Sequence, residues 1–201
     1  MYLLSLFSDV LKRTRYRITV GLLFSSVSTL AVGEPIFVTF NATYTAATCD
    51  ISVPTSVNFN QDEYAGGVPV SSVYGDNIQQ PFTIRFSRCV NNSFPEATPK
   101  ITVSGNVVAI GNEKFFSNNS DLPGEAAGYG VKLSTAGNLF FNPADNLAEN
   151  EVITATNNTT IAMLNNQELP MKAVLSCGPN DCADGTVGTF KAAVTFTLSY
   201  E

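Results

Sequence analysis

The segment 190–200 constrains the fold of this chain more than any other, because apolar and polar side chains alternate along it. The apolar positions are Phe190, Ala192, Val194, Phe196, Leu198 and Tyr200. A period of two residues predicts a β-strand with one apolar face. Such a strand at the end of a chain presents an unpaired backbone edge, which most soluble proteins protect. Such an edge is a template for pairing with another chain.

A second alternating segment lies in the N-terminal quarter of the chain. Its apolar face is formed by Ile36, Val38, Phe40, Ala42 and Tyr44. Further short strands are expected at 51–59, 81–89, 100–108, 130–133, 152–161 and 169–175, with loop and sheet edge at 61–77. At 201 residues, 44% of them hydrophobic, the chain can bury one core. We predict a single all-β domain, a sandwich of immunoglobulin-like architecture. By alternation alone, both segments fit equally well as ordinary core strands of a complete sandwich.

The first 33 residues have a different composition. Four basic residues, Lys12, Arg13, Arg15 and Arg17, precede the apolar run 18–30, and small residues follow at 31–33. The run is shorter than a spanning helix needs and contains several hydroxyl residues. The pattern favours a cleaved secretory signal over a retained membrane anchor.

The remaining chain is acidic. Without residues 1–33 it has 7 Lys and Arg against 16 Asp and Glu, a net charge of about −9. Nucleic acids and anionic membranes bind clustered Lys and Arg, so they are poor candidate partners.

Four cysteines, Cys49, Cys89, Cys177 and Cys182, follow the predicted signal. A secreted chain favours two disulfides, for which three pairings exist. Cys177 and Cys182 bracket the turn sequence Gly-Pro-Asn-Asp, which favours a bridge between them and leaves Cys49 with Cys89. A zinc site is the rival interpretation. However, the cysteines do not form the two closely spaced pairs that are typical of zinc folds, and the chain has no histidine. No metal or other cofactor is expected.

Taken together, these features resemble a pilin of the chaperone–usher family, a subunit of type 1-like or P-like fimbriae. The family pattern has a glycine fourteenth from the C-terminus and a penultimate aromatic residue, matched by Gly188 and Tyr200. It also has two cysteines about forty residues apart, matched by Cys49 and Cys89, and an alternating extension before the first cysteine. Ala42 departs from the pattern, since the family usually has glycine there, and the Cys177–Cys182 pair is an addition.

The resemblance implies an incomplete immunoglobulin-like sandwich that lacks its final strand. It divides the chain into a signal peptide (1–33), a donor-strand extension (34–47) and a pilin domain (48–201). The implied partners are a periplasmic chaperone, an outer-membrane usher and neighbouring fimbrial subunits, on a route through the periplasm to the cell surface. The acceptor groove strand would run from Gly188 to Tyr200, and the donor residues would be Ile36, Val38, Phe40, Ala42 and Tyr44. Each subunit would be joined to its neighbour by β-strand addition.

An enzyme is not expected, because the chain has no histidine for a Ser-His-Asp or Cys-His apparatus. The neighbouring carboxylates Asp62 with Glu63, and Glu149 with Glu151, lie in polar stretches typical of solvated loops. Five Asn-x-Ser/Thr matches, at Asn41, Asn91, Asn118, Asn157 and Asn158, carry no meaning in a bacterial pilin. We expect a structural fimbrial subunit that contributes to cell adhesion. The alternatives are a receptor-binding minor subunit or adhesin, and a complete secreted immunoglobulin-like binding module.

Overall fold

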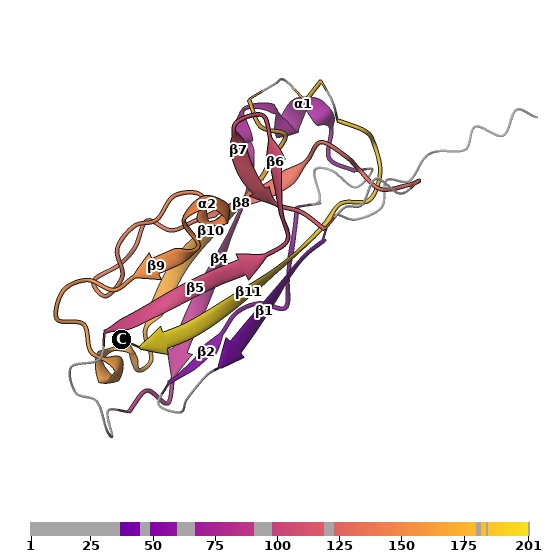
Figure 1. The fold of residues 1–201 in the computed structure, drawn as a ribbon. Coiled ribbons are helices and arrows are strands. Elements are labelled where there is room, and N and C mark those ends of the chain that lie inside the picture. Colours follow the sequence, from indigo (N-terminus) through magenta and orange to yellow (C-terminus); the bar gives the residue numbers. More distant parts are fainter. Residues whose placement is uncertain are drawn as a thin grey trace, which may run out of the picture. The chain divides into compact units, whose positions relative to one another are not determined.

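The computed structural model describes residues 37–44, 49–59, 67–90, 98–118, 123–179, 182–183 and 185–200. For 42–44 it describes the backbone alone. All of these residues belong to one unit of the chain, Ala31–Glu201. The predicted signal peptide and Ile36 lie outside the described residues. Within these ranges the fold is all-β and consists of two packed sheets (Figure 1).

The first sheet has five strands in the described part of the chain. In spatial order they are β3 (Ser56–Asn58), β1 (Phe37–Tyr44), β11 (Lys191–Tyr200), β5 (Pro99–Gly105) and β9 (Val152–Thr154). The β1–β11 pair is parallel, whereas the other three pairs are antiparallel. In Figure 1 the arrows of β1 and β11 accordingly point the same way.

The second sheet is antiparallel throughout its described pairs. Its order is β2 (Asp50–Ser52), β4 (Ile78–Ser87), β10 (Glu168–Ser176), β8 (Gly130–Ser134), β7 (Glu113–Phe116) and β6 (Val107–Ile110). The helices are single turns: α1 (Val70–Val73), η2 (Tyr74–Asp76), α2 (Leu147–Asn150) and η3 (Ile161–Leu164). Among the described residues, none of these helices has the length and apolar character needed to cross a membrane.

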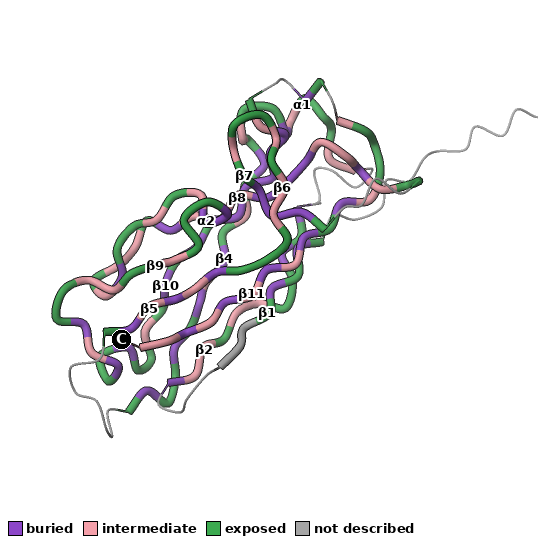
Figure 2. Tube along the Cα trace, viewed as in Figure 1, coloured by how far each residue is buried: buried purple, intermediate pink, exposed green. Residues whose placement is uncertain are grey.

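Side chains from both sheets form one core. Three aromatic rings connect the sheets at its centre: Phe40 of β1 stacks on Phe82 of β4 at 4.7 Å, and Phe196 of β11 lies 5.7 Å from Phe40 and 6.1 Å from Phe82. Figure 2 shows buried and less buried positions alternating along β11, as expected for a strand with one face on a core.

The strand predictions are confirmed in outline, with several differences. The expected strand 152–161 is a strand only at Val152–Thr154, and β7 lies where no strand was expected. The segment 61–77 was expected to be loop and sheet edge, but its described part contains α1 and η2. A single helical turn is too short to show the 3.6-residue apolar period by which a helix is predicted from sequence. Strand β4 begins at Ile78 rather than at Pro81. At Pro81 the one described neighbour of β4 is β10, because β2 pairs with β4 only at Arg85–Ser87. The other edge of β4 at Pro81 therefore has no strand partner among the described residues. Proline, which lacks an N–H, is tolerated at such an edge.

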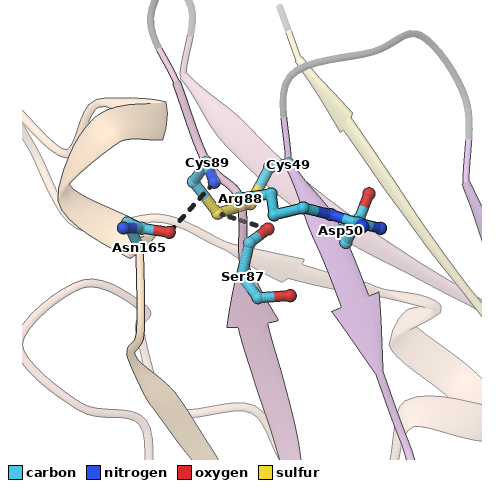
Figure 3. Close-up of a disulfide and its surroundings, with 6 residues drawn as sticks. All are labelled: Cys49, Asp50, Ser87, Arg88, Cys89 and Asn165. Atoms are coloured by element: carbon cyan, nitrogen blue, oxygen red, sulfur yellow. Dashed lines mark hydrogen bonds and ion pairs between the residues drawn. A yellow bond between two sulfur atoms is a disulfide. The ribbon is translucent and has the colours of Figure 1, made fainter.

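The structure contains the two predicted disulfides, Cys49–Cys89 and Cys177–Cys182. Figure 3 shows the first bridge where β4 ends and β2 begins. The backbone N–H of Cys89 donates to Oδ1 of Asn165 at 3.1 Å, and Arg88 forms an ion pair with Asp50 beside the bridge. The bridge therefore ties the start of β2 to the end of β4 and, through Asn165, to the turn before β10.

We expect the two bridges to differ in their effect on stability. Reducing Cys49–Cys89 opens a loop with a sequence separation of 40, whereas Cys177–Cys182 closes a separation of 5. In the chain-entropy model the longer loop is worth about 4 kcal/mol and the shorter one less. Cys49→Ser with Cys89→Ser should therefore lower the melting temperature more than Cys177→Ser with Cys182→Ser. Thermal unfolding of the two double variants measures this, and an equal loss in both would contradict it.

Candidate functional site

The strand predicted to act as a donor occupies the interior of the first sheet in this chain. All eight residues of β1, Phe37–Tyr44, pair with Lys191–Leu198 of β11, and Phe37–Thr39 also pair with β3. We call the strand position between β3 and β11 the β1 site. The edge of β11 is therefore covered by a strand of the same chain, whereas the resemblance implied a strand from another molecule.

Two of the five predicted donor side chains are described, and both are buried. Val38 is 0% exposed and Phe40 is 3% exposed, whereas Phe37 on the opposite face is 39% exposed. Phe40 contacts both of the aromatic residues at the core centre, Phe82 and Phe196. Alternation in the sequence thus corresponds to alternation in burial in the first half of β1.

The other three donor positions are described less fully. The backbone of Ala42 lies opposite Phe196, and that of Tyr44 lies opposite Leu198. Ile36 precedes the described residues. Ala42 and Tyr44 are therefore placed by backbone register alone.

Every apolar position of the predicted acceptor strand faces the core. Ala192, Val194, Phe196 and Leu198 are at most 2% exposed, and Phe190, just before β11, is 1% exposed. Tyr200 is partly buried and packs against the same core. On its second edge β11 pairs with β5, and the N–H of Ala193 donates to Oδ1 of Asn118 at 2.6 Å. With β1 removed, β11 would keep these partners and expose its β1 edge.

Gly188 lies where two backbone segments come unusually close. A Cβ atom at this position would meet the carbonyl carbon of Glu125 at 2.5 Å and the oxygen of Gly124 at 2.6 Å. The next residue, Thr189, makes two backbone hydrogen bonds to the same segment: its N–H donates to the carbonyl of Gly124 at 2.8 Å, and its carbonyl accepts from the N–H of Ala126 at 3.0 Å. These bonds hold the segment that leads into β11, so the fourteenth residue from the end has a steric reason to be glycine.

Gly188→Ala is expected to destabilise the domain by about 1 to 3 kcal/mol, because backbone atoms must shift to admit the methyl group. Val187→Ala is the matched control, since Val187 is 86% exposed and its truncation should change stability by less than about 0.5 kcal/mol. Denaturant titration of the two variants makes the comparison. Equal midpoints would show that the close approach at Gly188 has no energetic consequence.

The other residues singled out in the sequence are only partly described. Asp62, Glu63 and Asn91 lie outside the described residues. Glu149 of α2 accepts a hydrogen bond from the backbone N–H of Lys114 at 3.1 Å. The sequence analysis did not identify Phe82 as part of the site. The alternation within 81–89 shows which face of the strand Phe82 occupies, but not which strand it packs against.

Within the described ranges, no group of three or more Cys, Asp and Glu side chains is placed to hold a metal ion. The site offers backbone pairing and apolar contacts instead. Comparison with known proteins adds no assignment: no protein-family model matches the chain, and no curated protein matches it in sequence.

Proposed function

We propose that this chain is a structural subunit of a bacterial fimbria, assembled by donor-strand exchange through a periplasmic chaperone and an outer-membrane usher. In this proposal the pilin domain is an immunoglobulin-like sandwich that lacks one strand of its own, and the β1 site is the acceptor. A chaperone strand fills it first, and the N-terminal extension of a neighbouring subunit then replaces the chaperone. The role is structural rather than enzymatic, and the mature protein lies on the cell surface.

The observation that carries the proposal is the placement of β1. It supplies core side chains, yet it precedes the rest of the described domain in the chain, so it can leave the β1 site without unthreading any loop. An equivalent strand from another molecule can then enter, as in the exchange of identical elements between protomers. The incoming strand would gain backbone pairing along β11 and pockets for alternate side chains.

The apolar contacts of β1 are large enough to matter. Burial of Val38 and Phe40, both at most 3% exposed, contributes about 1.5 to 3 kcal/mol each by area bookkeeping. That figure is an upper estimate, because the free strand already buries some surface. An empty β1 site would expose this apolar surface and the β11 edge, which favours aggregation. The β1 site therefore needs a strand both before and after the subunit joins a fibre.

The pairing within one chain also supports a second candidate function. Because β1 completes the first sheet without help from another molecule, the chain fits a self-contained secreted binding module of immunoglobulin-like fold. The two functions differ in one respect. A fimbrial subunit donates its β1 strand to a neighbour, whereas a self-contained module keeps it.

Phe40→Asp tests the proposal in cells that express the subunit with its chaperone and usher. A carboxylate in the aromatic core position costs several kcal/mol, so the variant strand should not enter a neighbour's β1 site. The chaperone should still capture the variant, because the chaperone supplies its own strand. We expect a normal amount of chaperone–subunit complex and loss of the variant from fibres, measured by co-purification and by fibre composition.

Thr39→Asp is the matched control. Thr39 is exposed on the opposite face of β1, so its charge remains in water and incorporation should continue. Incorporation of Phe40→Asp at the level of the control would contradict donation by this strand. Failure of Phe40→Asp to form any chaperone complex would favour the self-contained module.

A further inference from the structure

Strand β1 is joined to the domain by a short connection. Four residues, 45–48, separate Tyr44 at the end of β1 from Cys49, which is tied to Cys89 by a disulfide. Fully extended, this connection lets Tyr44 and Cys49 lie at most about 18 Å apart. Both described neighbours of β1 in its sheet, β3 and β11, come after Cys49 in the chain. A second copy of the chain therefore offers β1 the same neighbours as its own copy does.

The parallel pairing of β1 with β11 determines at which end of the domain this connection lies. Tyr44 pairs with Leu198, close to the last residue of β11. Cys89 follows the end of β4, where β2 begins. In Figure 1 the arrowheads of β1, β4 and β11 all lie at this end of the domain. We call it the hinge end, and it is marked by Tyr44, Cys49 and Cys89.

A second copy that receives β1 in the same parallel direction must lie at the hinge end of the donor. The strand enters between β3 and β11 of the receiving copy, so its Tyr44 emerges at the hinge end of that copy. The donor's Cys49 follows within about 18 Å, and Cys49 marks the donor's own hinge end. The two domains therefore meet hinge end to hinge end. In this position the β1 strand of the receiving copy can reach the β1 site that the donor's strand has left.

Parallel entry favours a pair of copies over an open row. In a row, each domain would receive a strand from one neighbour and give its own strand to another, and both neighbours would compete for its single hinge end. Reciprocal exchange meets both needs with one neighbour, and it produces an isologous contact with two-fold symmetry. A fibre of the kind proposed above needs its two neighbours at opposite ends of each domain, so β1 would have to enter the acceptor in the reverse direction.

The hinge end carries exposed apolar side chains. Val90, which follows Cys89, is 47% exposed, and Met163 of η3 is 50% exposed. The turn that follows η3 lies beside the disulfide, because Oδ1 of Asn165 accepts a hydrogen bond from the backbone N–H of Cys89 at 3.1 Å. Two domains that meet at their hinge ends would remove apolar surface of this kind from water, which favours association.

We propose that two copies of the mature chain form a two-fold dimer by exchanging their β1 strands in the parallel direction. Each strand would repeat in the partner the pairs with β3 and β11, and the burial of Val38 and Phe40, that it has in a single chain. The contact between the hinge ends then has to offset the freedom lost on association. The proposal goes beyond the fimbrial function and does not depend on it. A dimerised subunit would have neither a free β1 strand nor a vacant β1 site, so dimerisation would withdraw it from fibre assembly.

Cross-linking of β1 to β11 shows whether the two strands belong to one copy or to two. Asn41 and Thr195 are register partners, Asn41 is exposed and Thr195 is only partly buried. The purified mature chain with Asn41→Cys and Thr195→Cys is separated by size at rising concentration, and each fraction is treated with a short bis-maleimide. The four native cysteines are in disulfides and do not react. We expect a dimer fraction that grows with concentration and gives a covalent dimer on a reducing, denaturing gel, whereas the monomer fraction gives internally linked monomer.

The single variant Asn41→Cys is the control for chance links between copies, and it should give no covalent dimer. Absence of a dimer at every concentration would overturn the proposal. A dimer fraction that contains only internally linked chains would also overturn it, because each copy would then have kept its own β1 strand.

Val90→Glu with Met163→Glu tests the two-fold contact itself. The added carboxylates of the two copies would face one another at the hinge ends, so the dimer should dissociate about tenfold more readily. Val70→Glu with Val187→Glu is the matched control, because these residues are 39% and 86% exposed and lie by α1 and before β11, at the other end of the domain (Figure 1). Analytical ultracentrifugation measures both dissociation constants. An unchanged constant in the hinge-end variant, or equal weakening in both variants, would overturn the two-fold geometry.

Discussion

Phe196→Asp is expected to abolish folding of the domain. Phe196 is 0% exposed and lies among Phe40, Phe82 and the core face of β11. The variant loses the packing of a large aromatic ring, which costs about 3 to 5 kcal/mol, and must bury a carboxylate or protonate it. Together these two costs are comparable with the usual net stability of a domain, about 5 to 15 kcal/mol. In the proposed assembly, chaperone capture should fail as well, because the altered residue lies in the strand proposed as the acceptor.

The measurement is the yield of soluble, protease-resistant subunit from the periplasm, with and without the chaperone. Thr197→Asp is the matched control, since Thr197 lies next to Phe196 on the opposite face and is only partly buried. The control should be recovered at a level near that of the unaltered chain. A soluble, compact Phe196→Asp monomer would show that this face of β11 is not part of a packed core.

The burial of the two key strands could be predicted from the sequence, because a period of two residues fixes which side chains share a face. Phe190 to Leu198 are buried at every even position, and Val38 and Phe40 follow the same rule. The disulfide pairing followed from the short turn between Cys177 and Cys182. In both cases the signal is local in the chain, so one segment is enough to reveal it.

The neighbour of each strand could not be predicted in the same way. Alternation does not reveal that Phe40 meets Phe82, or that β1 runs parallel to β11. These contacts join segments far apart in sequence, and many pairings satisfy the same pattern. Phe141 is a further case: it is 1% exposed and stacks on Phe86 at 5.4 Å, yet it lies outside every predicted strand.

Removal of residues 34–46 tests whether β1 can be supplied by another molecule. The shortened chain keeps β11, the Cys49–Cys89 bridge and the rest of both sheets, but its β1 site is empty. We expect it to be aggregation-prone alone, because it exposes the β11 edge and the pockets of Val38 and Phe40. In the proposed assembly, a periplasmic chaperone should still hold it in soluble form, because the chaperone strand would fill the β1 site.

The decisive measurement adds a peptide spanning residues 35–48 to the complex of the chaperone with the shortened chain. Native mass spectrometry then follows release of the chaperone and formation of a one-to-one complex of peptide and shortened chain. We predict exchange with the unaltered peptide and with a Thr39→Asp peptide, and no exchange with a Phe40→Asp peptide. Equal exchange by all three peptides, or a shortened chain that folds stably without any peptide, would contradict the assignment of β1 as a donated strand.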